Sequence, residues 1–137
     1  VDGETYFGYA QTHISWQFFW QFDQDRCWIT TVNTKLVTTY TLPKLETEHT
    51  DVTMIWNQWY PNLQRHEQGH HQLAVEIAQS IQQGISTLTP KALCADLEWQ
   101  ANQLGNNYIK QLEQQHRDYD ASTDYGASQG ANLFSYL

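Results

Sequence analysis

Positively charged side chains are scarce in this sequence of 137 residues. Only seven residues are Lys or Arg, against fifteen Asp and Glu, and the formal net charge is −8 at pH 7. Proteins that bind a nucleic-acid backbone depend on clustered Lys and Arg side chains, whose contacts release counterions. We therefore expect no nucleic-acid partner.

Long apolar runs are also missing. No stretch approaches the roughly 18 to 20 apolar residues that a membrane-spanning helix requires, so we expect no membrane span. The chain starts at Val1 without a signal-like segment. We expect that a leader has been removed or that the sequence was trimmed.

Linker-like segments are missing too, because no Gly/Ser-rich or Pro-rich stretch interrupts the sequence. A chain of this length forms a single core of ordinary size, and we predict one domain over residues 1–137. Hydrophobic residues make up 40% of the chain and aromatic residues 14%, so a core can form although the average residue is polar.

Cysteine is rare, and the chain contains two cysteine residues, Cys27 and Cys94. A disulfide between them would close a long loop, worth on the order of 4 kcal/mol in the chain-entropy model. Two unrelated buried thiols are the alternative. We favour the disulfide, which a secreted context would support.

The segment over about 6–42 is rich in β-branched and aromatic residues that alternate with polar ones, which is typical of half-buried strands. Three such runs can be distinguished, over residues 13–18, 27–32 and 35–42. A turn is expected at 23–25, and Pro43 ends the last run. We predict an antiparallel meander of about three strands.

Two long helices are predicted after the strands, over about 51–84 and about 90–116, so the predicted fold class is α+β. Thr50 or Asp51 suits the N-cap of the first helix. Pro61 lies inside its apolar pattern and predicts a kink or a break.

The second predicted helix opens at Thr89 and Pro90, because Thr suits the N-cap and Pro the first helical position. From residue 117 to residue 131 the sequence changes to small and turn-forming residues. Such residues predict a loop rather than a continued helix.

The first predicted helix contains His66-Glu67-x-x-His70. Residues four apart project from one face of a helix, so both imidazoles can reach one metal ion. A catalytic zinc ion keeps one position for a water molecule, which the Glu beside the first His can deprotonate. The motif predicts zinc ligands at His66 and His70 and a general base at Glu67.

The neighbouring sequence favours zinc over a chance match. Apolar residues recur at steps of three and four on both sides of the motif: Val52, Ile55, Trp56, Trp59, Leu63, Leu73, Ala74, Ile77 and Ile81. His66 and His70 fall on the same stripe, which faces inward. Buried imidazoles need polar partners or a metal to offset their desolvation, and we favour a metal over a satisfied core pair.

Further features accompany the motif: the Thr12-His13-Ile14-Ser15-Trp16 segment, Cys27, Thr41-Leu42-Pro43, Cys94, and Tyr119-Asp120-x-x-Thr123-x-Tyr125-Gly126-x-x-Gln129-Gly130-Ala131. Together they resemble the bacterial predicted secreted zinc-dependent proteases, which are catalogued mainly as a domain of unknown function. The resemblance implies a secreted or periplasmic metallopeptidase of zincin type. It would have a β-meander packed on the motif helix, a second long helix and a ligand-bearing C-terminal loop.

The resemblance also implies a third zinc ligand in that loop, where the family pattern reads Thr-x-His-Gly. Tyr125 stands at the position of the family's His. A phenolate can ligate a metal, whose charge favours the ionised form. Asp124 and Asp120 offer carboxylate oxygens instead. We rank Tyr125 first, Asp124 second and Asp120 third.

The predicted function is a zinc metallopeptidase that cleaves a polypeptide substrate. Glu67 would take a proton from a metal-activated water and pass it to the leaving amine. Zincin substrates commonly lie extended along a sheet edge, which the N-terminal strands could supply. Tyr119, His116 and Arg117 are candidates to stabilise the oxyanion by their position alone.

The alternative is a non-catalytic binding module for peptide or carbohydrate. Its many Trp and Tyr residues would form the binding platform, and the His pair would hold a structural metal. A closed site with four protein ligands would favour the module, whereas an open site would favour the enzyme.

Overall fold

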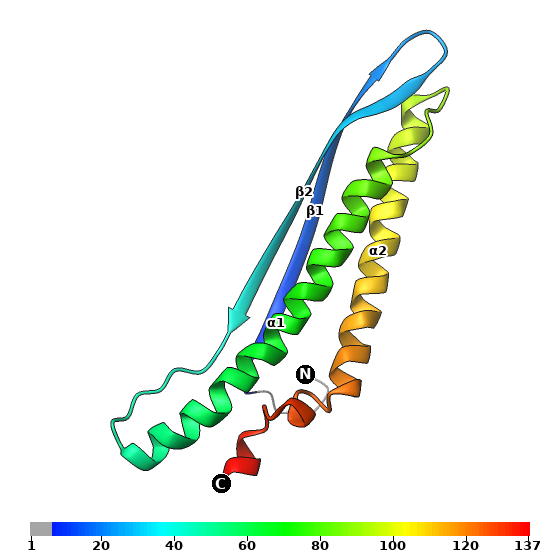
Figure 1. The fold of residues 1–137 in the computed structure, drawn as a ribbon. Helices are drawn as coiled ribbons and strands as arrows, with labels where there is room; N and C mark the ends of the chain where they lie inside the picture. Colours follow the sequence, from blue (N-terminus) through cyan, green and yellow to red (C-terminus); the bar gives the residue numbers. More distant parts are fainter. Residues whose placement is uncertain (1–6) are drawn as a thin grey trace. The chain divides into compact units, whose positions relative to one another are not determined.

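The computed structural model describes residues 7–137 (Figure 1). It contains the antiparallel strands β1 (Tyr9–Phe22) and β2 (Cys27–Thr41), the helices α1 (Thr50–Ser86) and α2 (Cys94–Ser122), and two short 3-10 helices, Ala127–Gln129 and Leu133–Tyr136. The predicted α+β class is confirmed. Tyr6, where the predicted strand region begins, lies outside the described residues.

The chain divides into two compact units. The first contains the chain through residue 12 together with residues 38–72 and 116–137, and the second contains residues 13–37 and 73–115. Both strands and both helices contribute residues to each unit. The assignment of residues 1–137 to one domain stays a prediction.

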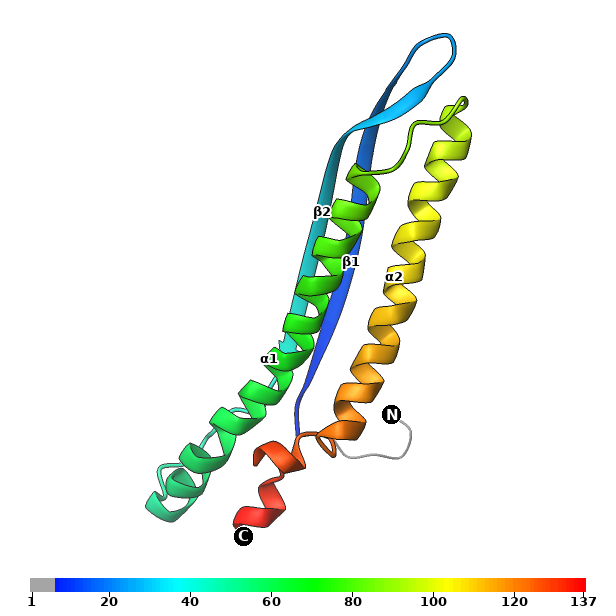
Figure 2. The same ribbon diagram turned by 45° about the vertical axis from the view of Figure 1, so that its right-hand side comes forward.

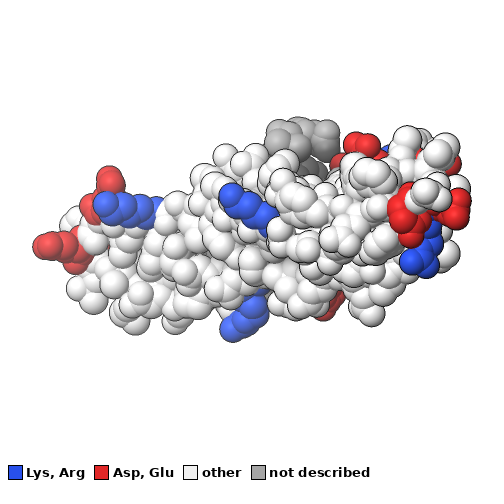
Figure 3. Space-filling model, turned by 90° about the horizontal axis from the view of Figure 1, so that it is seen from above, with Lys and Arg blue, Asp and Glu red and all other residues white. Residues whose placement is uncertain are grey.

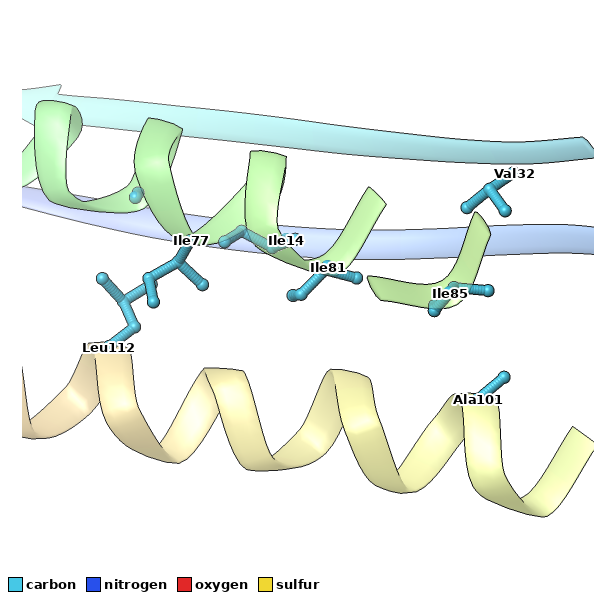
Figure 4. Packing of buried hydrophobic residues seen from close by; sticks show 8 residues of the cluster. Ile14, Val32, Ile77, Ile81, Ile85, Ala101 and Leu112 are labelled. Atoms are coloured by element: carbon cyan, nitrogen blue, oxygen red, sulfur yellow. The ribbon is translucent and has the colours of Figure 1, made fainter. Parts of the chain in front are cut away.

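The core of the second unit is built from the strands and both long helices (Figure 4). Its buried members are Ile14, Val32, Ala74, Ile77, Ile81, Ile85, Ala101 and Leu112. The α1 members recur at steps of three and four, which brings them to one side of that helix. Burying each large aliphatic side chain stabilises the fold by about 1.5 to 3 kcal/mol.

The predicted meander of about three strands is wrong for the described residues, which form one two-stranded sheet (Figure 2). We expected a break between the runs 27–32 and 35–42, but β2 continues through Asn33 and Thr34. The two-residue alternation is kept across this point, because Val32, Thr34 and Leu36 are all less exposed than the residues between them. Neither Asn33 nor Thr34 is Gly or Pro, so nothing forces the backbone to turn at this point.

The predicted start of the second helix at Thr89 and Pro90 is also wrong, because α2 begins at Cys94. Lys91 instead forms an antiparallel bridge with Cys27, and their backbones exchange hydrogen bonds of 2.6 and 3.0 Å. The predicted Cys27–Cys94 disulfide is confirmed. The extended backbone at Lys91 and the disulfide hold this segment beside the strand, so the helix starts only afterwards.

Reduction of the Cys27–Cys94 disulfide is expected to lower the unfolding midpoint by about 10 to 20 °C. The bond joins residues 67 apart. In the chain-entropy model this constraint is worth about 4 kcal/mol, and each kcal/mol shifts the midpoint of a chain of this size by about 3 to 5 °C. Thermal melting followed by circular dichroism, with and without reductant, measures the shift. The Cys27→Ser/Cys94→Ser double variant should not respond to reductant, and equal midpoints for the oxidised and reduced protein would contradict the expectation.

The first unit has its own apolar cluster, in which Trp59, Leu63 and Ala131 are buried. The indole Nε1–H of Trp59 donates a 2.8 Å hydrogen bond to the backbone carbonyl of Ala131. This contact fixes the C-terminal segment on α1, close to the His66-Glu67-x-x-His70 motif.

Helix α1 passes Pro61 without a break. Proline removes the hydrogen bond to the carbonyl four residues earlier, at Asn57. Both residues lie on the exposed side of the helix, where water can satisfy the freed carbonyl. The motif therefore lies within regular helix, as its spacing requires.

No helix in residues 7–137 is long and apolar enough to cross a membrane. On the face drawn in Figure 3, the Lys and Arg side chains are few and stand apart. That face carries none of the basic clustering that phosphate binding requires.

Candidate metal site

The motif side chains are buried in the first unit, which the apolar stripe predicts for His66 and His70. His66 and Glu67 are each 4% exposed and His70 is 7% exposed. The two imidazoles lie one helical turn apart, with ring centroids 5.2 Å apart.

The carboxylate of Asp120, on α2, lies between the two imidazoles. Its Oδ1 is 3.0 Å from His66 Nε2 and 2.8 Å from His70 Nε2. These three residues form a group whose ligand atoms all lie within 4.8 Å of one another. Ligand atoms bound tetrahedrally to zinc at about 2.0 to 2.1 Å are about 3.3 Å apart, so a small adjustment would admit the ion.

The position of the proton on the His66 ring follows from the partner of its Nδ1 atom. Nδ1 lies 2.7 Å from Oε1 of Gln129, an amide oxygen that only accepts hydrogen bonds, so Nδ1 carries the proton. In a neutral imidazole, Nε2 then has a lone pair, which faces the carboxylate of Asp120. Two electron-rich atoms at this distance need a second proton or a cation between them, so the donor set fits a metal ion.

Tyr119 and Gln129 also contact His66. The Tyr119 hydroxyl donates to the backbone carbonyl of His66 at 2.8 Å and accepts from Gln129 Nε2 at 3.1 Å. The Tyr119 ring stacks on the imidazole, with centroids 4.8 Å apart and planes 10° apart. Tyr119, one of the oxyanion candidates, thus contacts the backbone of a proposed ligand.

Gly69 makes this packing possible, and Gly69→Ala is expected to lower the stability of the protein. A Cβ there would overlap the hydroxyl and ring of Tyr119. Alanine usually gains about 1 kcal/mol over glycine in a helix, whereas overpacking costs about 1 to 3 kcal/mol. Melting of the metal-free variant, with Gln68→Ala as an exposed control on the same helix, measures the difference. A midpoint above that of the wild type would refute the overlap.

Glu67 has one carboxylate oxygen without a hydrogen-bond partner among the described residues, Oε2. The backbone N–H of Ala10 donates a hydrogen bond to the same carboxylate. Burial raises the pKa of Glu67, and the neighbouring His66 and His70 offset only part of this effect. A buried carboxylate with a free oxygen and a raised pKa is suited to accept a proton.

The pKa values of three other groups near the motif are shifted by burial and by their contacts. Burial acts to raise the pKa of Asp120, but hydrogen bonds from His66 and His70 outweigh it and hold this pKa well below its usual range. Burial acts to lower the pKa of His66, but hydrogen bonds to Asp120 and Gln129 outweigh it and raise the pKa above 6.5. Burial, with the nearby His70, lowers the pKa of His116 to about 4.

A cavity of about 630 Å³ lies beside the motif. Residues Gly8 to Gln11, where β1 begins, line one wall, and the motif with His116 and Asp120 lines another. Leu63 and Ala131 add apolar surface. The proposed metal ligands therefore border a space that can admit a second molecule.

All three candidates for the third ligand line this cavity. Asp120, ranked last from the sequence, is the one whose carboxylate contacts both histidines. Asp124 and Tyr125 follow the helix with φ of 50° and 53°, and Tyr125 is 46% exposed. The predicted loop over 117–131 begins later than expected, because α2 continues to Ser122. Asp120 is therefore a helical residue.

Sequence reasoning missed one signal on this helix. His116 and Asp120 are four residues apart, the same spacing as His66 and His70, so they project from one face of α2. The sequence suggests His116 only as an oxyanion candidate, but in the structure its Nδ1 lies 2.7 Å from His70 Nδ1. Its Nε2 lies 3.1 Å from the hydroxyl of Thr12.

Comparison with known proteins identifies the family. The model of the family described as "Bacterial protein of unknown function (DUF922)" matches residues 1–126, and the chain belongs to this family. Neither the curated proteins nor the solved structures contain a match.

Proposed function

We propose that this member of the DUF922 family is a secreted or periplasmic zinc-dependent metallopeptidase of zincin type, which acts on polypeptides. His66, His70 and Asp120 would hold the metal, and Glu67 would be the general base. Membership of a family of unknown function leaves the activity open, so the proposal rests on the site itself. The disulfide is compatible with an oxidising compartment.

One observation carries the proposal. Two imidazole nitrogens and a carboxylate oxygen converge beside a buried carboxylate that has a free oxygen, at the edge of a cavity. Three protein ligands would leave a zinc ion one position for water, which distinguishes a catalytic from a structural site. When bound, zinc supplies a Lewis acid that lowers the pKa of water and polarises a carbonyl.

Glu67 would move the proton in this reaction. Its free Oε2 accepts a proton from the attacking water, whose oxygen forms a bond to the scissile carbonyl carbon. The carbon–nitrogen bond then breaks, and Glu67 returns the proton to the leaving amine. The low exposure of Glu67 keeps bulk water from competing for this proton.

The wall formed by Gly8 to Gln11 suggests how a polypeptide would bind. The sheet has two strands, so β1 pairs with β2 along one edge and leaves its other edge outside the sheet. An extended peptide can add to such an edge by main-chain hydrogen bonds. The N–H of Ala10 contacts the carboxylate of Glu67. A peptide that binds along this edge beside Ala10 would therefore have its scissile bond near Glu67.

Metal loading and hydrolysis test the proposal together. Purified protein should bind about one zinc ion per chain, cleave an unstructured protein such as casein, lose activity to a chelator and regain it with zinc. Mass spectrometry of the fragments would show which bonds break. Zinc binding without any cleavage, in a site with no exchangeable water, would favour the non-catalytic module.

Zinc affinity is expected to fall as the pH is lowered, by about tenfold for each unit below the pKa of His66, because the ligand must lose its second proton. This pKa is raised in the metal-free protein, so proton competition begins above 6.5. Competition with a chromophoric chelator between pH 5.5 and pH 8 measures the effect. Constant affinity over this range would exclude His66 as a ligand.

A further inference from the structure

His116 occupies a position that the proposed chemistry does not use directly. It lies on α2 one turn before Asp120, and its ring centroid is 4.8 Å from that of His70. Its Nδ1 is 2.7 Å from His70 Nδ1, and its Nε2 is 3.1 Å from Thr12 Oγ1. The three side chains therefore form a hydrogen-bonded row that starts in β1 and ends at a proposed metal ligand.

The short distance between the two Nδ1 atoms constrains their protons. Two ring nitrogens at 2.7 Å form a hydrogen bond only when one carries a hydrogen and the other offers a lone pair. If His70 binds a metal through Nε2, a neutral His70 carries its hydrogen on Nδ1. His116 Nδ1 must then be the acceptor, and its own hydrogen lies on Nε2 and is donated to the hydroxyl of Thr12.

We propose that His116 is a positioning residue, which accepts the Nδ1–H of His70 and so fixes the tautomer and the ring orientation in which His70 presents Nε2 to the metal. This inference rests on the proposed metal site. Gln129 makes the corresponding contact with His66 through an amide oxygen. The two ligands are thus held by different acceptors, one from α2 and one from the C-terminal segment.

Thr12 completes the row and links it to the cavity. The residues just before it, Gly8 to Gln11, form the wall where a peptide would lie. The Thr12 hydroxyl accepts from His116, which keeps the acceptor nitrogen of His116 directed at His70. The strand that borders the cavity is therefore connected to the metal ligand through two hydrogen bonds.

Zinc affinity of four variants tests this role without relying on catalysis. His116→Leu removes the acceptor at similar volume and should weaken zinc binding by about 10- to 100-fold, as loss of an outer partner usually does. His116→Asn places an amide oxygen near the position of Nδ1 and should recover most of that loss. Thr12→Val should weaken zinc binding less than His116→Leu does. His49→Leu, at an exposed position, should leave the zinc affinity unchanged.

The tautomer of His116 gives a second readout on the folded wild type. Nitrogen-15 NMR of the zinc-loaded protein should show His116 protonated on Nε2 and unprotonated on Nδ1. If His116→Leu does not fold, this measurement and the zinc affinity of Thr12→Val test the role of His116.

Three results would overturn the inference. They are wild-type zinc affinity in folded His116→Leu, equal losses in His116→Leu and His116→Asn, or a hydrogen on Nδ1 of His116 in the zinc-loaded protein. Equal losses would mean that a hydrogen-bond acceptor at position 116 does not account for the effect. If the wild type binds no zinc, the proposed function falls too, whereas unchanged affinity in an active His116→Leu enzyme removes this inference alone.

Discussion

Glu67→Gln is expected to reduce peptide hydrolysis by about 10² to 10⁴-fold, the usual contribution of a general base. Zinc content should stay the same, because Glu67 belongs to the motif but not to the group of converging ligand atoms. The amide keeps the size of the side chain and cannot accept the proton from water. Steady-state rates and metal analysis of one preparation measure both effects.

Glu76→Gln is a matched control, since Glu76 is an exposed glutamate on the same helix. It should leave rate and zinc content unchanged. Wild-type turnover in Glu67→Gln would remove Glu67 from the mechanism. Loss of zinc together with activity would instead make Glu67 a ligand.

The same substitution should not lower the stability of the metal-free protein. A glutamate whose pKa is raised by folding stabilises the native state only below its unfolded pKa, and this contribution is lost as the pH rises through the folded pKa. Burial raises the pKa of Glu67, so its ionised form costs stability at neutral pH. A neutral amide avoids that cost, and the midpoint of Glu67→Gln should equal or exceed that of the wild type.

The motif helix could be predicted because its signals are local. A long apolar repeat identifies the buried side of α1, and the burial of His66 and His70 follows from their place in it. Pro61 is tolerated because it lies on the exposed side. The disulfide was also favoured from the sequence, because a secreted context would support it and two cysteines allow only one pairing within the chain.

The extent of α2 and the placement of Asp120 between the two histidines could not be predicted in the same way. Residues 117–122 contain Asp, Tyr, Ala and Ser, which suit turns and helices alike, and the first glycine comes only at Gly126. Packing of Tyr119 on His66 and the contacts of Asp120 with both histidines hold this stretch as helix. These contacts join residues more than 45 positions apart, which no local pattern reports.

We propose Asp120 as the third ligand ahead of Tyr125 and Asp124, because its carboxylate contacts both histidines. Asp120→Asn is then expected to weaken zinc binding by roughly two orders of magnitude or more. A lost ligand should cost more than the 10- to 100-fold that is typical of an outer partner. The metal-free variant offers a separate readout. The carboxylate of Asp120 raises the pKa of His66, so Asp120→Asn should lower it in an NMR titration.

Tyr125→Phe and Asp124→Asn are the matched comparisons, because both residues line the same cavity. If neither residue is a ligand, each should change zinc affinity by less than the 10- to 100-fold that is typical of an outer partner. A phenol titrates near pH 10, so a tyrosine ligand would add a second pH dependence that a carboxylate, already ionised at neutral pH, would not. If Tyr125→Phe strips the metal and Asp120→Asn retains it, Tyr125 is the third ligand, and Asp120 serves only to orient the two histidines.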